Sequence, residues 1–336
     1  METTRAAVLH AAGDVRIEQV PLRPPGPGDA LVAIDAVGVC GSDMHYFADG
    51  RNGQNVLRSP TVLGHEASGV ITAAGADVDL AVGTRVAIEP AVGCGHCPTC
   101  RSGRYHLCPT GTCFGSPPTH GTLAQHLVVS RRALHPLPAA IGTELGSLIE
   151  PLAVAVWAVQ RADVRAGHRV LVTGSGPIGI LVMQVALACG AAEVVVTDVN
   201  DARLAVARSL GATATINTAE RAPELTGVHR LLECSGHPAA LWQGIRTLGP
   251  AARATVVGQA APSVDGLPLA FLQRYEIDLV TAFRYAHAFP TAIALVERGV
   301  VDIDAVLTGR FPLDRTAEAL RAPVLDPSHL KVVIRP

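Results

Sequence analysis

The chain has 336 residues, of which 49% are hydrophobic and 17% are charged, and its formal net charge at pH 7 is −2. This composition excludes an intrinsically disordered chain, and the length corresponds to roughly two domains of about 150 residues each. Because there is no excess of positive charge, nucleic acid and anionic membranes are not expected as partners. Only Lys331 of the 27 basic residues is a lysine, which argues against a Schiff-base lysine, a P-loop lysine or a lysine general base.

The N-terminal residues 1–5 lead directly into a strand-like run, without the long apolar segment of a secretory signal. The most apolar stretches, 148–160 and 178–189, are short or carry Gln, Glu or Pro, so neither is expected to cross a bilayer. Eight cysteines are too few for a disulfide scaffold in a chain of this length. We therefore expect a cytoplasmic protein with reduced thiols.

Residues 1 to about 150 are predicted to be β-rich, because short apolar runs alternate there with Gly and Pro clusters. The expected strands lie at 6–9, 31–39 and 68–73. Helical periodicity then begins after residue 150 and continues to residue 160. This change of pattern predicts a domain boundary near residue 150.

Beyond that boundary, strands and helices alternate, which predicts a parallel sheet with helices on both faces. The expected strands lie at 169–173, 193–197, 231–234 and 254–257. The expected helices between the first of these strands lie at 178–189 and 202–210. From about residue 284 the alternation fades, and the remaining predicted elements are a helix at 289–297 and a strand at 331–334.

A glycine-rich turn follows the predicted strand at 169–173 and has the spacing of a dinucleotide-binding site. Gly174 would form the turn, Gly176 would let the backbone approach a pyrophosphate, and Gly179 would let the helix pack closely on the strand. Asp198 ends the next strand, about 20 residues further on, where a carboxylate can accept hydrogen bonds from a ribose diol. The sequence thus predicts NAD, while Arg203 leaves NADP open as the alternative.

Four cysteines lie close together in one short lobe at about 93–109, namely Cys94, Cys97, Cys100 and Cys108. Four thiolates at this spacing are typical of a closed, structural zinc site. An iron–sulfur cluster is the alternative, but the last spacing differs from the ferredoxin pattern. The lobe is therefore predicted to bind structural zinc.

A second group of possible metal ligands is spread along the β-rich region. Cys40, His65, Glu66 and Glu150 together offer one thiolate, one imidazole and two carboxylates. Such a mixed set is typical of a catalytic zinc site that keeps one position open for water or substrate. Each residue alone is a weak signal, since single cysteines and histidines are common in protein cores.

At this point the sequence resembles the zinc-dependent medium-chain dehydrogenases over essentially the whole chain. Within that family it is most similar to the polyol dehydrogenases of the sorbitol and xylitol type. The motifs that carry the likeness are the segments 39–46, 63–69, 87–90, 149–154, 283–285 and 309–313. The resemblance implies an α/β fold in which a GroES-like β-rich catalytic domain, 1–153 and 284–336, flanks a Rossmann domain, 154–283. Substrate and nicotinamide are expected between the two domains, and the assembly is expected to be a homotetramer or homodimer.

The same resemblance implies roles for the candidate metal ligands. Cys40, His65 and Glu150 are expected to hold the catalytic zinc ion, and Glu66 is expected to bind it in some states or through water. Asp43 is expected to orient the ligand imidazole. Together with the cysteine lobe, this implies two zinc ions per chain.

Further residues are assigned by the resemblance to proton transfer, substrate and cofactor. Ser42 and His45 would form a proton relay from hydroxyl to imidazole. The expected substrate contacts, in addition to Ser42 and Glu150, are Tyr46, Phe114, Arg284 and Tyr285. The expected cofactor contacts besides the three glycines are Pro177, Ile178, Asp198, Arg203, Val257, Gly258, Phe283 and Arg284. One departure concerns Phe114, which is shifted relative to the family pattern within the run 113–118, so the shape of the substrate pocket is left open.

The resemblance implies a zinc-dependent, reversible oxidation of a polyol secondary alcohol to a ketose with NAD. An L-idonate 5-dehydrogenase or another secondary-alcohol dehydrogenase on the same scaffold is the nearer alternative. A non-catalytic binding protein is the more distant alternative, because dehydrogenase scaffolds can be reused. A complete open metal site argues against it, since a binding role has no use for one.

Overall fold

The computed structural model describes residues 2–259 and 265–336, and these residues form two compact units. One unit is Met1–Glu150 with Leu307–Pro336, and the other is Pro151–Val306. We predicted boundaries at 153 and 284, so the main difference is the segment 284–306, which is part of the second unit. Its contacts explain this: the side-chain amide of Gln184 donates to the Asp302 carbonyl at 3.0 Å and accepts from the Asp302 N–H at 2.8 Å.

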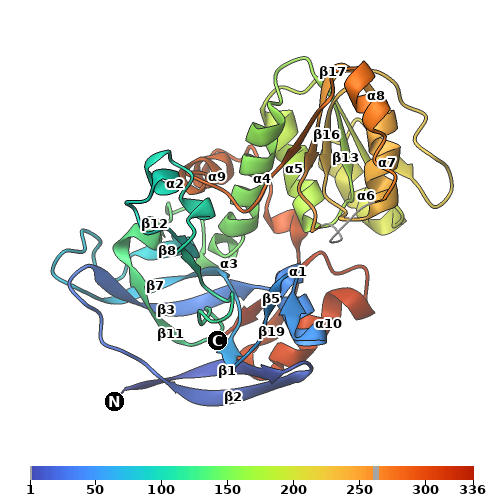
Figure 1. The fold of residues 1–336 in the computed structure, drawn as a ribbon. Helices are drawn as coiled ribbons and strands as arrows, with labels where there is room; N and C mark the ends of the chain where they lie inside the picture. Colours follow the sequence, from blue (N-terminus) through green and yellow to red (C-terminus); the bar gives the residue numbers. More distant parts are fainter. Residues whose placement is uncertain (1, 260–264) are drawn as a thin grey trace. The chain divides into compact units, whose positions relative to one another are not determined.

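The first unit is β-rich, as predicted (Figure 1). Its main sheet has the order β12-β8-β7-β3-β20-β19, and β11 also pairs with β3. These strands are β3 (Asp29–Gly38), β7 (Glu66–Ala74), β8 (Arg85–Ile88), β11 (His126–Ser130), β12 (Leu134–Pro136), β19 (Leu307–Pro312) and β20 (Lys331–Arg335). The C-terminal strand β20 thus lies beside β3 from the N-terminal segment of the unit, and this pairing joins the two segments.

Smaller elements complete this unit. A second sheet has the order β2-β1-β6, and two short hairpins are β4–β5 and β9–β10. Their strands are β1 (Thr3–Ala11), β2 (Asp14–Pro21), β4 (Arg51–Asn52), β5 (Asn55–Val56), β6 (Thr61–Val62), β9 (Ala91–Val92) and β10 (Thr112–Cys113). The helices are α1 (Gly41–Asp49), α2 (Pro98–Arg101), α3 (Thr143–Gly146), α10 (Thr316–Leu325) and the first residues of α4 (Ile149–Ala162).

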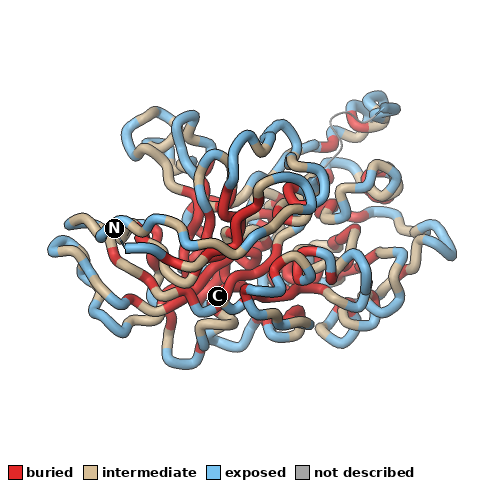
Figure 2. The backbone as a smooth tube through the Cα atoms, turned by 90° about the horizontal axis from the view of Figure 1, so that it is seen from below, coloured by how far each residue is buried: buried red, intermediate tan, exposed pale blue. Residues whose placement is uncertain are grey.

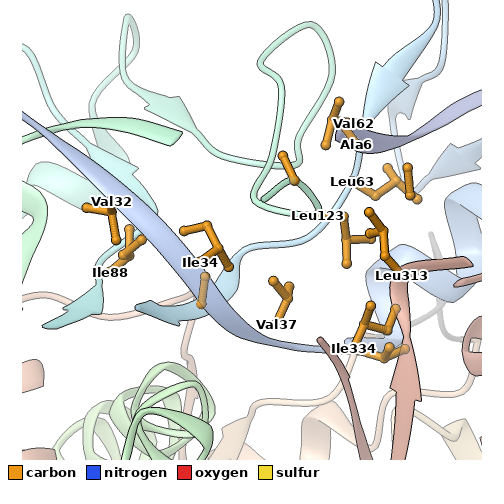
Figure 3. Close-up of a cluster of buried hydrophobic side chains, with 14 of the residues drawn as sticks. Ala6, Val32, Ile34, Val37, Val62, Leu63, Ile88, Leu123, Leu313 and Ile334 are labelled. Carbon is orange, nitrogen blue, oxygen red and sulfur yellow. The ribbon is translucent and has the colours of Figure 1, made fainter. Parts of the chain in front are cut away.

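The apolar side chains of these strands form one core. Figure 3 shows part of it, where Val32 of β3 lies beside Ile88 of β8 and Val37, further along β3, lies toward Ile334 of β20. Figure 2 shows the burial along the backbone, with buried residues toward the inside and exposed residues mainly at the outer turns. Buried and more exposed residues alternate along β3 from Asp29 to Ala36, so one face of the strand packs against the core.

The second unit contains the predicted parallel sheet, and every strand pair in it is parallel. Its strands are β13 (Arg169–Thr173), β14 (Glu193–Asp198), β15 (Ala214–Asn217), β16 (Val228–Glu233), β17 (Leu248–Val256) and β18 (Asp278–Thr281). The spatial order β15-β14-β13-β16-β17-β18 is the 3-2-1-4-5-6 order of dinucleotide-binding folds. The fold class predicted from the sequence is therefore confirmed.

Helices follow most of these strands. They are α5 (Pro177–Ala188), α6 (Asp201–Ser209), α7 (Pro238–Arg246), α8 (Leu269–Arg274) and α9 (Phe289–Glu297). Helix α5 is apolar on nearly all sides and buried from Gly179 to Ala186, because it packs on β13 and β14. The sequence did not reveal β15, α7, α8 or β18, whose apolar runs are short or interrupted. No helix among the described residues is long and apolar enough to cross a membrane.

Candidate metal and cofactor sites

The first candidate site is a group of three possible metal ligands, Cys40, His65 and Glu66, whose ligand atoms all lie within 4.8 Å of one another. Cys40 follows β3 and caps the N-terminus of α1, while His65 and Glu66 stand where β7 begins. The antiparallel pairing of β3 with β7 places Gly38 opposite Glu66, so the end of one strand meets the start of the other. Residues 25 positions apart are thus brought together, and the three side chains offer sulfur, nitrogen and oxygen donors suited to zinc.

Asp43 lies next to this group and contacts two of its neighbours and His65. Its carboxylate is almost fully buried and accepts the N–H groups of Cys40 and Gly64, each at 3.1 Å. Burial alone would raise the pKa of Asp43, but the neighbouring His65 and these N–H donors hold it below its ordinary value. His65 Nδ1 lies 3.7 Å from the Asp43 carboxylate, which leaves Nε2 as the ring nitrogen for a metal.

Glu150 lies outside this group of three, although we predicted it as a zinc ligand. It is buried in the first turn of α4, at the border of the first unit. Its direct ligation of zinc therefore stays a prediction.

Lys331 is the residue that sequence reasoning missed. Its ammonium group lies 2.7 and 2.8 Å from the two carboxylate oxygens of Glu66. Lys331 is far from the metal ligands in the sequence, but β20 pairs with β3 and carries it to them. The only available signal was its uniqueness, a single lysine among 27 basic residues.

The second candidate site is the cysteine lobe, where the sulfur atoms of Cys94, Cys97, Cys100 and Cys108 also lie within 4.8 Å of one another. Backbone N–H groups already point at these sulfurs: Cys97 donates to Cys94, Cys100 donates to Cys97, and Cys94 donates to Cys108, each at 3.4 Å. The N–H groups of His96 and Cys97 lower the pKa of the Cys94 thiol to about 6. Burial raises the pKa of the Cys100 thiol to about 12. Three of the four sulfurs thus accept backbone N–H groups, and four thiolates at this spacing match a closed tetrahedral zinc site.

A partly buried hydrogen-bonded group connects the lobe to the β-rich unit. The Glu89 carboxylate accepts the Tyr105 hydroxyl on one oxygen and lies 2.7 Å from His135 Nε2 on the other. Tyr105 belongs to the lobe, whereas Glu89 follows β8 and His135 is in β12. Sequence reasoning used Glu89 only as part of a motif and did not predict this anchoring contact.

The glycine turn of the second unit has the geometry required for a dinucleotide. Gly174 follows β13 with φ of 86°, and Gly176 caps α5. A Cβ atom on Gly179 would lie 1.8 Å from the Gly174 carbonyl oxygen, so only glycine fits there. The Ser175 hydroxyl is buried without a hydrogen-bond partner among the described residues, as expected where a polar ligand completes the turn.

Asp198 stands beside this turn at the end of β14. One carboxylate oxygen accepts the Ser175 N–H at 2.6 Å, and the other accepts the N–H groups of Val199 and Asn200. The carboxylate is thereby held at the edge of the sheet next to the glycines, where a ribose diol binds in such folds. Arg203 lies in the first turn of α6, the helix that follows.

The remaining predicted cofactor residues lie at the same edge of this sheet, because the carboxyl ends of parallel strands meet there. Val257 and Gly258 follow β17, and both N–H groups donate to the Glu233 carbonyl at 2.8 Å. Phe283 and Arg284 follow β18, and the Arg284 guanidinium lies 4.9 Å from the Phe283 ring centre. Their contact with a cofactor stays a prediction.

The predicted relay and substrate residues lie partly in the first unit and partly in the second. Ser42 and His45 are three residues apart on α1 and so share a helix face, with Tyr46 buried on the same helix. Phe114 follows β10 and packs partly against the core of the first unit. Tyr285 belongs to the second unit, where its ring is fully buried against Phe289. Their roles toward a substrate stay predictions.

Comparisons with known proteins follow this division into two units. Residues 26–139 match the family model described as the alcohol dehydrogenase GroES-like domain, and residues 177–298 match the model described as zinc-binding dehydrogenase. Sorbitol dehydrogenase of Bacillus subtilis (strain 168) is 35% identical over 100% of this chain and 98% of that protein. The chain belongs to the zinc-dependent alcohol dehydrogenases.

Other relatives of this dehydrogenase support the same family assignment. Sorbitol dehydrogenase of Gallus gallus is 40% identical over 94% of this chain and 91% of that protein. The crystal structure of L-idonate 5-dehydrogenase from Escherichia coli superposes with a TM-score of 0.93 at 29% identity, covering 100% of this chain and 99% of that one. In this dehydrogenase the mixed group around Cys40 fits an open catalytic zinc ion, the cysteine lobe fits a closed structural one, and the Rossmann unit carries the NAD motif.

Proposed function

We propose that this dehydrogenase oxidises a secondary hydroxyl group of a polyol to a ketone with NAD, in a reversible reaction. The observation that carries the proposal is the mixed thiolate, imidazole and carboxylate group at Cys40, His65 and Glu66, in a chain whose second unit carries the glycine motif. Relatives named sorbitol dehydrogenase, which match over at least nine-tenths of the chain, support a polyol as substrate. The substrate class rests on these relatives and the activity class on the metal ligands.

When bound, zinc supplies the Lewis acidity that favours loss of the hydroxyl proton, and NAD supplies the hydride acceptor. Cys40 and His65 hold the metal, and Asp43 keeps the His65 ring in the tautomer that presents Nε2. The buried surroundings of Asp43 and Glu66 limit access of water to the inner side of the group. The residues of the chain then have to bind and orient the substrate and to move its proton.

Ser42 is the candidate acceptor of the substrate proton. His45 lies on the same face of α1, its ring is about half exposed, and its Nδ1 is 3.8 Å from the Asp49 carboxylate. In the proposed relay the Ser42 hydroxyl accepts the substrate proton while it gives up its own proton, which reaches solvent through the His45 ring. The proposed relay starts near the metal ligand Cys40 and ends at the protein surface.

The test is a screen of NAD reduction with four- to six-carbon polyols and aldonates, with and without a chelator. We expect at least one polyol to be oxidised and the activity to be lost with the chelator and restored by zinc. Metal analysis should give two zinc ions per chain, one for each ligand group. A fully zinc-loaded protein that reduces no NAD with any polyol would contradict the proposal.

Oxidation of the C5 hydroxyl of a sugar acid is the second candidate function. The observation that favours it is the close superposition with L-idonate 5-dehydrogenase. The aldonates in the same screen separate the two functions, since a polyol enzyme should have the higher kcat/KM with uncharged substrates. Preference for an aldonate over every polyol would establish the second function instead.

We further propose that the protein is a cytoplasmic homo-oligomer, a dimer or a tetramer. Strand β18 ends the six-stranded sheet, and the apolar side chains of Leu267, Leu269 and Leu279 are exposed beside it. Thiolate zinc ligands need a reducing compartment, which supports the cytoplasm. Sedimentation equilibrium and cell fractionation test the two statements, and a monomer in solution would contradict the first.

A further inference from the structure

Glu233 is a buried carboxylate that the proposed reaction does not use. It is the last residue of β16 and is only 2% exposed. Its Oε1 atom accepts the N–H groups of Ser235 at 2.7 Å and Gly236 at 2.9 Å, and it also accepts the Ser235 hydroxyl. The hydroxyl of Thr173, the last residue of β13, donates to the same oxygen at 3.5 Å. One carboxylate oxygen thus fixes the turn that follows β16 and connects it to the neighbouring strand.

The segment 234–237, here called the β16 loop, joins β16 to α7 and is held by hydrogen bonds along its length. The Cys234 N–H donates to the Thr173 carbonyl oxygen at 2.8 Å, and the His237 N–H donates to the Ser235 hydroxyl oxygen at 3.0 Å. Gly236 has a φ of 71°, a conformation that glycine adopts readily. The Glu233 side chain therefore binds the two central residues of a loop whose ends are also fixed.

The loops on both sides pack directly against the β16 loop. A Cβ atom on Gly174, which follows β13, would stand 2.8 Å from the Ser235 nitrogen. A Cβ atom on Gly258, which follows β17, would stand 2.4 Å from the Gly236 nitrogen, and the Gly258 N–H donates to the Glu233 carbonyl oxygen at 2.8 Å. Because the three backbones touch without intervening side chains, a displaced β16 loop would disturb the packing of both neighbours.

The strand order indicates which half of a dinucleotide the β16 loop would face. Asp198 ends β14 on one side of β13, and Glu233 ends β16 on the other side. In this fold a dinucleotide lies across the carboxyl ends of the strands, with its pyrophosphate at the turn after the first strand. The adenosine ribose is expected at Asp198, so the nicotinamide half would extend over the β16 loop.

We propose that Glu233 is a positioning residue that holds the β16 loop in the shape that receives the nicotinamide half of NAD. This inference rests on NAD as the cofactor of the proposed function. Glu233 acts through the loop and not by contact with the substrate. Because all four contacts use Oε1, the role requires the reach of one acceptor oxygen and does not require the negative charge.

The test compares two conservative variants by calorimetric titration with NADH and with ADP, which carries adenosine and two phosphates but no nicotinamide. Glu233→Asp keeps the charge but withdraws the acceptor oxygen from the loop by one CH₂ group. We expect its Kd for NADH to rise about 10-fold, the effect of one or two lost hydrogen bonds, while its Kd for ADP stays within about twofold of wild type. Glu233→Gln keeps the reach without the charge, and its Kd for NADH should stay within about threefold of wild type.

Two further variants make the interpretation specific. Glu193→Asp is the matched control, because Glu193 begins β14 at the opposite edge of the same parallel sheet, where its carboxylate lies 2.6 Å from Arg169. Both of its Kd values should equal those of wild type. Gly236→Ala displaces the β16 loop by another route, since a Cβ atom there would stand 2.5 Å from the Gln259 carbonyl oxygen. It should weaken the binding of NADH and spare that of ADP.

The ratio of the two Kd values separates a positioning role from a merely structural one, which would weaken both ligands alike. Equal weakening of NADH and ADP in Glu233→Asp, unchanged NADH binding, or a larger loss in Glu233→Gln than in Glu233→Asp would overturn the inference. If Glu233→Asp does not fold, Ser235→Ala decides by the same ratio, since it removes the hydroxyl between Glu233 and His237. Binding is measured without polyol, so a wild type that binds NADH but oxidises no polyol would reject the proposed substrate alone.

Discussion

The two metal-ligand groups of the first unit are built in opposite ways. The four ligands of the cysteine lobe come from 15 consecutive residues, 94–108, and backbone N–H groups of the same loop point at their sulfurs. The group around Cys40 is assembled from the ends of β3 and β7, with β20 behind it. A local loop can form the closed site, whereas the open site exists only when the whole sheet is folded.

This difference predicts which parts of the molecule should tolerate substitution. Loss of a lobe ligand removes the metal that holds one loop together, but the Glu89 contacts still connect that loop to the sheet. Loss of a ligand or supporting residue at the open site leaves the sheet intact but removes the chemistry. We therefore expect effects on turnover to fall in size from the open site outward to the lobe.

The largest effect is expected for Cys40→Ala. Without its thiolate the open site should lose its zinc ion and turnover should fall by more than about 1,000-fold, since the Lewis acid is missing. Metal analysis should give one zinc ion per chain, and the thermal unfolding midpoint should stay within about 2 °C of wild type because Cys40 is only half-buried. Measurable wild-type turnover in a variant with one zinc ion would refute the assignment of the open site.

A smaller effect is expected for Asp43→Asn. The change keeps the size of the side chain but removes the charge that faces His65, so the imidazole is held less firmly for the metal. We expect the affinity of the open site for zinc to fall by about 10- to 100-fold. Release of zinc to a chromophoric chelator should show a faster phase for this site and an unchanged phase for the lobe. Two unchanged phases would show that Asp43 has no part in metal binding.

The same contrast explains how much of the molecule could be predicted from sequence. Ligands at short spacing, such as Cys94 and Cys97, and the glycines that follow a strand, such as Gly174, form patterns within one segment. The parallel sheet was predictable because its buried strands are continuous apolar runs.

The partners of Glu66 could not be predicted from any one segment. Gly38 and Lys331 meet it only through strand pairing across 28 and 265 positions of the chain. Nothing in a glycine before a cysteine or a lysine near a terminus reveals that pairing. The resemblance to a known family placed Cys40, His65 and Asp43 correctly as neighbours, but it was the register of β3, β7 and β20 that revealed the cation behind them.

A still smaller effect on turnover is expected for Gly38→Ala. The added Cβ atom would collide with Glu66 Oε2 and push the carboxylate from its place beside Lys331. We expect kcat to fall by about 10-fold, at the low end of the range for residues that support a metal ligand. Gly28→Ala is the matched control, because Gly28 precedes the other end of β3 and a Cβ atom there meets nothing within 4 Å. Equal kcat values for the two variants would show that the space at Gly38 does not matter.

The smallest effect on turnover is expected at the lobe, for Cys97→Ala. The variant should lose one zinc ion, as Cys40→Ala does, but kcat of the folded protein should fall by only about twofold because the open site is untouched. The substitution should instead lower the stability. The thermal unfolding midpoint should fall by about 5 °C, which corresponds to about 2 kcal/mol in the free energy of unfolding for a unit of this size. Cys189→Ala, an exposed cysteine outside both groups, should keep both zinc ions and the wild-type midpoint. If Cys97→Ala instead lost turnover as completely as Cys40→Ala while remaining folded, the two sites would be coupled, and the division into a chemical site and a structural one would not hold.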